Sequence, residues 1–249
     1  MNYRYLAQSI GGFIQQTAVC YLQRGYWFYV MGEIPKGKDP ERIDQKLLDK
    51  YEINLSKYQR YRRKKDGWAN LQYLRYRNTF LLLSTKGQHL FFSEEQSRIQ
   101  DARRCPLHVF GYALTYRNGR ALVSLDKENY RNLEAYFSER ALHRGASDIA
   151  DEIKQLPYES YAPVRRQLLS IVAAANKRRQ TAGLPPVPYQ CIRYKRTIYQ
   201  PFAPESPAAL AREEEIIEPR RMDKAEPLSE QLYSKSPISS GLLTGQEVH

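Results

Sequence analysis

His89, Glu94 and Glu95 bring together the residue types that a metal-dependent nuclease uses. An imidazole can act as a base or a metal ligand, and carboxylates hold hard cations such as Mg²⁺ or Mn²⁺. His89 follows an apolar run, and the two glutamates come a few residues later. We therefore treat His89, Glu94 and Glu95 as candidate catalytic residues, with Mg²⁺ or Mn²⁺ as the cofactor of such an enzyme. A solvated turn histidine before a capped helix explains the same pattern without any cofactor.

Tyrosine is a second source of chemistry, because the chain holds 20 copies. A tyrosine hydroxyl can attack a phosphodiester and stay covalently attached to it. Enzymes that nick DNA in this way carry a His-hydrophobic-His pair that places two imidazoles on a metal. His89 is followed by Leu90 and Phe91, so this pair is missing. Most of the tyrosines are therefore expected at core edges or in stacking surfaces.

Two shorter motifs resemble functional sites, but each lacks a residue that the function would need. Residues Gly32 to Asp39 read GEIPKGKD and fit the phosphate-loop pattern G-x-x-x-x-G-K. The next position should be Ser or Thr, and Asp39 there would repel phosphates. Cys105 and His108 have metal-like spacing, but a structural zinc needs four ligands and no second close pair exists. We interpret the first motif as a lysine-rich turn in which Asp39 caps the next helix, and the second does not favour a zinc site.

The stretch from Lys57 to His89 interleaves cations with aromatic rings, among them Tyr58 and Tyr61. Cations that bind phosphate and flat rings that stack on bases are typical of nucleic-acid-binding surfaces. A second basic region follows, because no acidic residue occurs from Ser160 to Pro204. The candidate nucleic-acid-binding residues are Lys57, Arg60, Arg62, Arg63, Lys64, Lys65, Tyr73, Arg75, Arg77, Arg178, Arg179, Arg193, Lys195 and Arg196.

The charge balance supports a polyanionic partner. The net charge is +12, but residues 1–202 hold 34 Lys and Arg against 18 Asp and Glu, while residues 203–249 hold 5 against 9. The first part is therefore more basic than the whole chain. Such a field attracts DNA or RNA, which we expect to be bound mainly through the phosphate backbone.

Two other functions remain open at this point. One is an enzyme acting on DNA, either a metal-dependent nuclease or a tyrosine nicking enzyme, so the sequence leaves enzymatic activity undecided. The other is a scaffold subunit whose basic faces bind an acidic protein and whose C-terminal tail recruits a partner.

Hydrophobic spacing predicts the elements that carry these residues in the first half of the chain. Gly11 and Gly12 fall inside a predicted helix, where each costs about 1 kcal/mol relative to alanine, so a close neighbour or a break is expected there. Asp39 should cap the next helix, with Pro40 at its first position. The predicted elements are a helix over 6–21, a strand over 26–30, helices over 40–51 and 55–65, a strand over 71–83 and a helix over 93–104.

The second half is predicted to begin with a hairpin, because Asn118-Gly119 is the strongest short turn signal in the chain. The strands around it are 107–116 and 120–125. Helices are expected over 127–142, 148–156 and from Pro163 to Gly183. A strand over 190–199 should then share a sheet face with the strand over 71–83.

These elements predict an α+β fold with an antiparallel or mixed sheet packed against several helices. We expect a basic globular domain over residues 1–203 and a disordered, mildly acidic tail over 204–249, with 210–217 as its only short helix. No apolar run approaches the ~20 residues of a spanning helix, so no membrane partner is expected. Cys20, Cys105 and Cys191 are odd in number and widely spaced, which favours free thiols and a cytoplasmic location.

Overall fold

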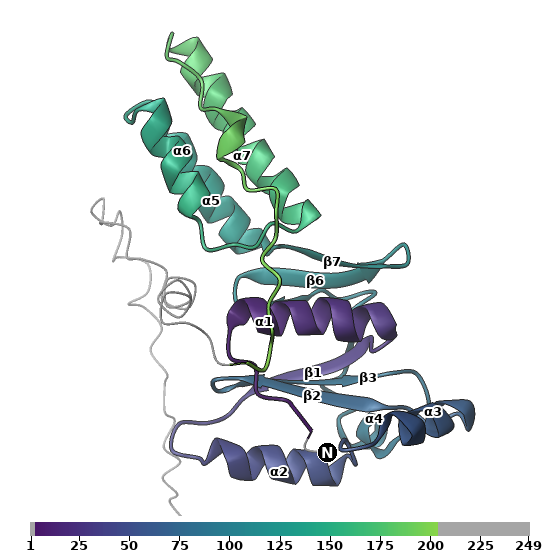
Figure 1. Cartoon of the computed structure of the whole chain (residues 1–249). Coiled ribbons are helices and arrows are strands. Elements are labelled where there is room, and N and C mark those ends of the chain that lie inside the picture. Colours follow the sequence, from purple (N-terminus) through teal and green to yellow (C-terminus); the bar gives the residue numbers. More distant parts are fainter. Residues whose placement is uncertain (1–2, 204–249) are drawn as a thin grey trace, which may run out of the picture.

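The computed structural model describes residues 3–203 and shows an α+β fold with two antiparallel sheets (Figure 1). The predicted fold class is therefore confirmed, whereas residues 204–249, with the predicted tail and its short helix, lie outside the described residues. The elements are α1 (Ile10–Gln15), η1 (Gln16–Tyr21), η2 (Leu22–Arg24), β1 (Phe28–Glu33), α2 (Pro40–Lys50), α3 (Lys57–Lys65), β2 (Leu71–Tyr76), β3 (Thr79–Ser84), α4 (Leu90–Glu94), β4 (Gln100–Asp101), β5 (Leu107–Val109), β6 (Tyr112–Arg117), β7 (Arg120–Leu125), α5 (Lys127–Arg140), α6 (Ala146–Gln155), α7 (Ala162–Thr181) and η3 (Tyr189–Cys191).

The elements stack in layers. The first sheet has the strand order β2-β3-β1-β4, and the second sheet has the order β5-β6-β7. In Figure 1, α2 lies below the first sheet, α1 lies between the two sheets, and α5, α6 and α7 lie beyond the second sheet. One core therefore runs from the first sheet through α1 to the helices at the far end.

The first sheet is buried on both faces, which explains its apolar run. Leu81 and Leu83 of β3 join the core around α1, while Leu82 joins a smaller core under α2 and α4. Successive strand side chains point to opposite faces, so both faces must be apolar where both are covered. Leu81, Leu82 and Leu83 are all buried, and Phe80 packs partly buried against the smaller core.

The single strand predicted over 71–83 is wrong, because this stretch is a hairpin. β2 and β3 pair antiparallel, with Leu71 opposite Ser84 and Tyr76 opposite Thr79. The chain turns at Arg77 and Asn78, and Arg77 has φ +50°. A non-glycine residue in this left-handed region is uncommon, so the sequence carried no strong turn signal.

Three further predicted elements are also wrong. The strand expected over 107–116 is two strands, β5 and β6, which pair antiparallel around a turn at Phe110 and Gly111. The helix expected over 93–104 is a short α4 that ends at Glu94, followed by the two-residue strand β4. The strand expected over 190–199 consists of η3 followed by a segment without strand pairing, so it shares no sheet face with β2. In contrast, the Asn118-Gly119 hairpin and the helices α2, α3, α5, α6 and α7 are confirmed to within a few residues at their ends.

Residues 193–203 form a segment that we call the strap, which crosses α1 at its paired glycines. The ring of Tyr199 lies where a side chain at Gly11 would be, and Pro201 lies against Gly12. Gln15 clamps the strap by donating to the carbonyl oxygen of Tyr199 (2.9 Å) and accepting from its amide (3.2 Å). The close neighbour expected at Gly11-Gly12 is therefore confirmed.

No helix within residues 3–203 is long and apolar enough to cross a membrane. The three cysteines, which all lie in this part of the chain, are free thiols, as their spacing indicated.

Candidate nucleic-acid interface

Helix α3 is a cationic helix that contributes nothing to either core. It reads KYQRYRRKK, and none of its residues is buried. It forms because Ser56 and Gln59 make a capping box: the Ser56 hydroxyl accepts from the Gln59 amide (3.2 Å), and the Gln59 side chain accepts from the Ser56 amide (2.8 Å). Its four cations in the last turn also suit the helix dipole.

Backbone contacts dock α3 against the body and leave most of its side chains in solvent. The Asn70 side chain donates to the carbonyl oxygen of Arg60 (2.9 Å), and the Trp68 amide donates to that of Arg63 (2.8 Å). Arg63 also pairs with Glu52 at 2.8 Å. Among the ion pairs of the described chain, this is the only one that involves an α3 cation, so the other five keep their charge available to a partner.

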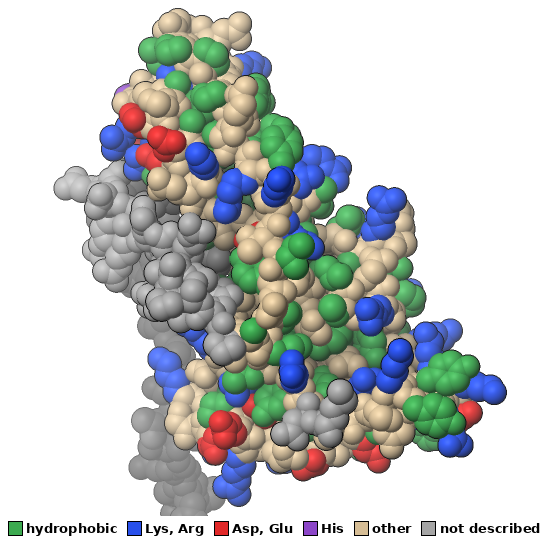
Figure 2. All heavy atoms as spheres, in the orientation of Figure 1, with side chains coloured by type: hydrophobic (Ala, Val, Ile, Leu, Met, Phe, Trp, Pro, Cys, Tyr) green, Lys and Arg blue, Asp and Glu red, His purple; other side chains and the backbone are tan. Residues whose placement is uncertain are grey.

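One stripe of α3 combines rings with charge. Tyr58, Tyr61, Arg62 and Lys65 follow the i, i+3, i+4, i+7 spacing of one helix face. Tyr58 and Tyr61 are each 67% exposed, and the Arg62 guanidinium lies 5.9 Å from the Tyr58 ring centre. Figure 2 shows hydrophobic and basic side chains gathered over the corner of the molecule that holds α3.

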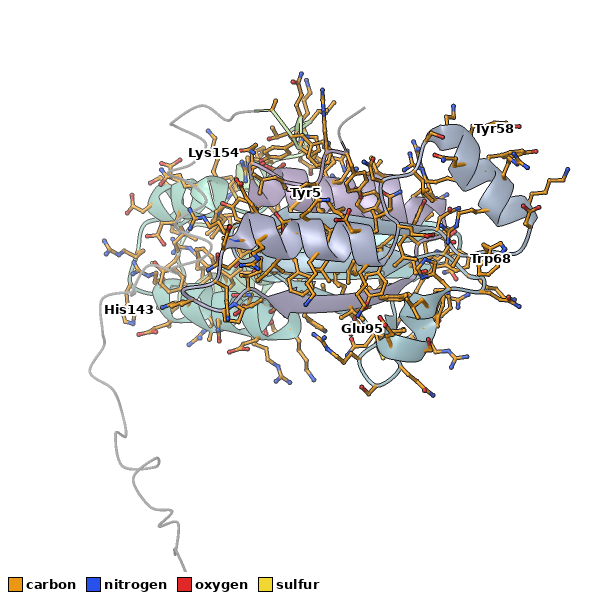
Figure 3. All side chains as sticks on the ribbon, turned by 90° about the horizontal axis from the view of Figure 1, so that it is seen from below. Tyr5, Tyr58, Trp68, Glu95, His143 and Lys154 are labelled. Carbon is orange, nitrogen blue, oxygen red and sulfur yellow. The ribbon has the colours of Figure 1, made fainter. Side chains whose placement is uncertain are left out.

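Trp68 extends this surface, and the sequence analysis missed it. Its side chain is 47% exposed in the loop after α3. Figure 3 shows Tyr58 and Trp68 at the same end of the molecule. The signal in the sequence was a lone tryptophan directly after Asp66-Gly67, a turn that places the ring beside the end of the helix.

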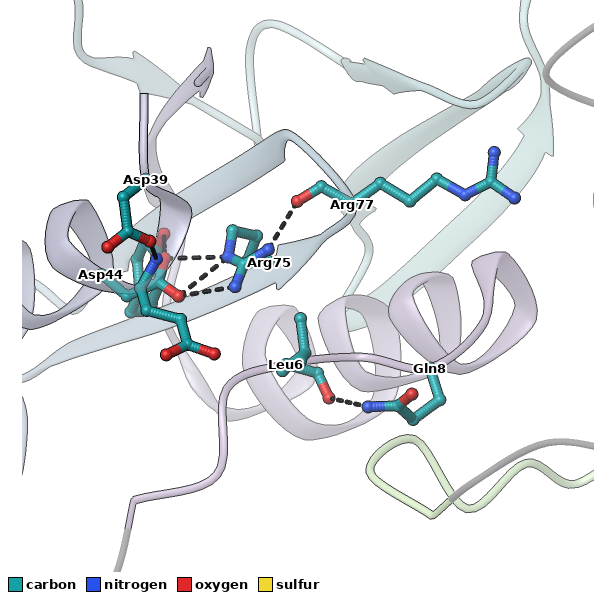
Figure 4. A network of polar contacts seen from close by, with 8 residues as sticks. Leu6, Gln8, Asp39, Asp44, Arg75 and Arg77 are labelled. Atoms are coloured by element: carbon teal, nitrogen blue, oxygen red, sulfur yellow. Dashed lines mark hydrogen bonds and ion pairs between the residues drawn. The ribbon is translucent and has the colours of Figure 1, made fainter. Parts of the chain in front are cut away.

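The structure places Tyr73 and Arg75 inside the protein, so the expectation that they face a partner is wrong. Their side of β2 is covered by α2, and Asp44 of α2 supplies the counter-charge. The Asp44 carboxylate accepts from the Tyr73 hydroxyl (2.5 Å). It also pairs with the Arg75 guanidinium (2.7 Å), as Figure 4 shows. Arg75 also donates to the carbonyl oxygen of Arg77 (2.7 Å). Burial, followed by the Asp44 carboxylate, raises the pKa of Tyr73 well above its ordinary value.

Arg77 is exposed but does not join α3. It follows the last residue of β2, whereas α3 leads into the first, and six strand residues span about 20 Å. Its guanidinium lies 5.6 Å from the Tyr76 ring centre. Arg77 is therefore separated from α3 by the length of the strand.

The second basic region is largely structural. Arg179 is buried and donates to the carbonyl oxygens of Ala141, Arg144 and Pro185 at 2.6–2.8 Å. Because those bonds close the end of the helical layer, the expectation that Arg179 meets phosphate is wrong. The end of α7 also lies at the opposite end of the molecule from α3 (Figure 1).

The remaining candidate cations of that region are divided between α7, which carries Arg178, and the strap, which carries Arg193, Lys195 and Arg196. Arg193 donates to the carbonyl oxygens of Leu156 and Tyr158, both at 2.7 Å, and so ties the strap to the body. Arg178 donates to the Ser138 hydroxyl, Arg196 lies 4.8 Å from the ring centre of Tyr161, and Lys195 is exposed.

His89, Glu94 and Glu95 are close in space but each has a structural partner. The His89 imidazole caps α4 by accepting the Phe91 amide at Nδ1 (3.0 Å). Glu94 pairs with Lys50 (2.7 Å), and this hydrogen bond lowers the pKa of Glu94. Glu95 accepts from the Tyr51 hydroxyl (2.9 Å).

No group of three or more His, Cys, Asp and Glu side chains in residues 3–203 is arranged to hold a metal ion. The residues present therefore do not fit the metal that a nuclease would need. The catalytic role of His89, Glu94 and Glu95 stays a prediction.

The His89 cap predicts a pH-dependent stability. Burial, with the nearby Arg63 charge, lowers the pKa of His89 below its ordinary value of 6.5. The unfolded chain then takes up the proton first, so the contribution of His89 is complete above pH ~6.5 and is lost as the pH falls toward the folded-state pKa. His89→Asn keeps a capping acceptor that does not titrate. We expect the free energy of unfolding of the wild type, relative to that variant, to fall on acidification in urea titrations. A constant difference would contradict the assigned cap.

No protein-family model matches the chain, and no curated protein matches its sequence.

Proposed function

We propose that the protein binds nucleic acid through the α3 surface, which we define as Tyr58, Tyr61, Trp68 and the cations of α3. One observation carries this proposal: a helix with six cations and two tyrosines buries none of its residues. Such a helix gains little from packing, so its composition is explained better by a partner than by the fold. DNA and RNA both satisfy this chemistry.

The spacing of the charges on α3 also supports a polyanionic partner. Lys57, Arg60 and Lys64 repeat at spacings of three and four, where like charges destabilise a helix by about 0.2–0.5 kcal/mol per pair. The repulsion is offset when phosphates lie between the cations. Counterion release then supplies sequence-independent affinity. The α3 surface is therefore suited to a polyanion with regularly spaced charges.

A salt titration tests this function. If about four cations neutralise phosphates, the affinity for a generic oligonucleotide should fall about 100-fold between roughly 50 and 200 mM salt. Fluorescence anisotropy with a labelled oligonucleotide measures this slope. A polyglutamate chain of matched charge is the control, because it offers carboxylates without bases or phosphates. No binding at low salt would reject the proposal, and equal binding of polyglutamate would favour an acidic protein partner.

A further inference from the structure

We infer that the preferred ligand of the α3 surface is a single strand, whose unpaired bases stack on Tyr58, Tyr61 and Trp68. The inference rests on the proposed function and concerns the class of nucleic acid. It is carried by the exposed rings, because binding to phosphate requires only the cations of α3. Cations alone would account for binding to any phosphate backbone.

The two tyrosines are placed as a pair of stacking platforms. Residues three apart on a helix have Cβ atoms roughly 5–6 Å apart, so the two rings project side by side. Each of these tyrosines is 67% exposed, whereas tyrosines that belong to the cores, such as Tyr51 and Tyr112, are 1% exposed. The Tyr61 ring is therefore open to a flat partner, whereas the Tyr58 ring has the Arg62 guanidinium 5.9 Å from its centre and offers a base its other face.

Trp68 adds a third ring on a rigid support. Its amide donates to the carbonyl oxygen of Arg63, and the next amide, that of Ala69, donates to the carbonyl oxygen of Gln88 (3.0 Å). Gly67 makes the turn with φ +82°, a conformation that suits glycine. The backbone of Trp68 is thus fixed on both sides while its indole stays 47% exposed. This ring costs little additional ordering when it binds a base.

Trp27, the other tryptophan of the chain, differs from Trp68 because its ring is used in contacts within the protein. Trp27 donates its indole N–H to the carbonyl oxygen of Leu22 (3.1 Å) and is covered by the Arg103 guanidinium, 4.5 Å from its ring centre. Its ring has a structural role in the body. Trp68 has no comparable cover among the aromatic and cation contacts of residues 3–203.

Base pairing decides which strands can use these rings. In a duplex the face of each base is covered by its neighbours, so a protein reaches only groove edges and phosphates. In a single strand the bases can be splayed out and stacked on aromatic side chains. Arg62 and Lys65, on the same stripe as the tyrosines, are placed to contact the phosphates that link such bases.

The test compares strands and rings in one experiment with the full-length protein. Anisotropy is measured with labelled oligothymidine, oligouridine and a mixed-sequence duplex of about 20 nucleotides per strand, longer than the 4–16 that one small binding fold covers. The variants are Tyr58→Leu with Tyr61→Leu, Trp68→Leu, and Tyr189→Leu as a matched control, because Tyr189 is 46% exposed in η3, which packs against α6. Circular dichroism checks that each variant is folded.

We expect the wild type to bind the single strands more tightly than the duplex. The double tyrosine variant should lose about 10- to 100-fold in single-strand affinity, and Trp68→Leu about 5-fold or more. Each base that stacks on an aromatic side chain adds substantially to the free energy of binding. Duplex affinity and the Tyr189→Leu variant should change less than about 2-fold, because neither involves stacking. The two single strands separate DNA from RNA as the better ligand.

Two results would overturn the inference in different ways. Duplex binding as tight as single-strand binding, with the ring variants unchanged, would reject the stacking mechanism and leave the proposed function standing. No binding of any strand by the wild type would reject both.

Discussion

Replacing Arg62, Lys64 and Lys65 by glutamine should weaken binding to any oligonucleotide about 100-fold near 0.1 M salt. Each lost phosphate contact reduces the salt slope by about 0.9 on duplex and 0.7 on single strands, so the slope should fall by about 2 to 3. The reason is geometric: the three side chains are exposed in the last turn of α3, and none of them forms an ion pair within residues 3–203. Anisotropy across a salt series measures both quantities.

The matched control removes the same number of positive charges from another part of the surface. Lys127→Gln, Arg131→Gln and Lys154→Gln also remove three exposed cations, but on α5 and α6 at the other end of the molecule. Glutamine is a good helix former, so neither variant should lose more than a few tenths of a kcal/mol in stability. We expect the control to lose less than about 5-fold in affinity. An equal loss in both would show that the overall field, and not α3, attracts the ligand.

Asp44→Asn should destabilise the protein by about 3–5 kcal/mol, because it leaves the Arg75 charge buried without a counter-charge. The Asp44 side chain has no exposed surface, and that of Arg75 is 8% exposed. The Tyr73 hydroxyl would also lose its carboxylate acceptor. Urea unfolding, read as a change in midpoint at constant slope, measures the loss.

Asp49→Asn is the control on the same helix. Its carboxylate is exposed and accepts only from the Gln45 side chain (2.7 Å), so the expected change is below about 0.5 kcal/mol. Replacing both members of the buried pair, with Asp44→Leu and Arg75→Met, should restore most of the stability, since no buried charge is then unpaired. An Asp44→Asn midpoint equal to that of the wild type would contradict the described ion pair.

Local signals made much of the fold predictable. Asp39 and Pro40 begin α2 as the capping pattern indicated, and the Asp39 carboxylate accepts the Glu41 amide (3.0 Å). Asn118-Gly119 makes the expected turn. These features depend on neighbours in the chain, so sequence spacing is enough to find them.

The buried charges could not be predicted because they depend on contacts between distant elements. The alternating pattern of Tyr73 and Arg75 would be the same in a strand whose face is exposed to solvent and in one whose face is covered by α2. The sequence alone therefore does not show which face is buried. The spacing of Ile43, Leu47 and Tyr51 marks one face of α2, and Tyr51 is buried. The buried residues within the helix are nevertheless Asp44 and Leu48, each one position further along the chain. A helix that buries an aspartate needs a cation opposite it, and Arg75 is that cation.

The residues of the candidate site were predicted only in part, because some of the candidate cations make contacts with distant segments of the chain. The α3 cations were found because a helix without apolar spacing must stay on the surface. Arg179 also looked like a surface cation at the end of a helix, but three backbone carbonyl groups from other segments converge on it. Only the fold could show that its charge is already used.

Photo-cross-linking tests the central claim most directly. A single strand that carries bromouracil is irradiated with the protein, and the cross-linked residues are identified by mass spectrometry. Our account predicts cross-links at Tyr58, Tyr61 or Trp68, which are lost at high salt and in the Arg62→Gln, Lys64→Gln, Lys65→Gln variant. Cross-links confined to the strap or to the end of α7, with none at the α3 surface, would contradict it.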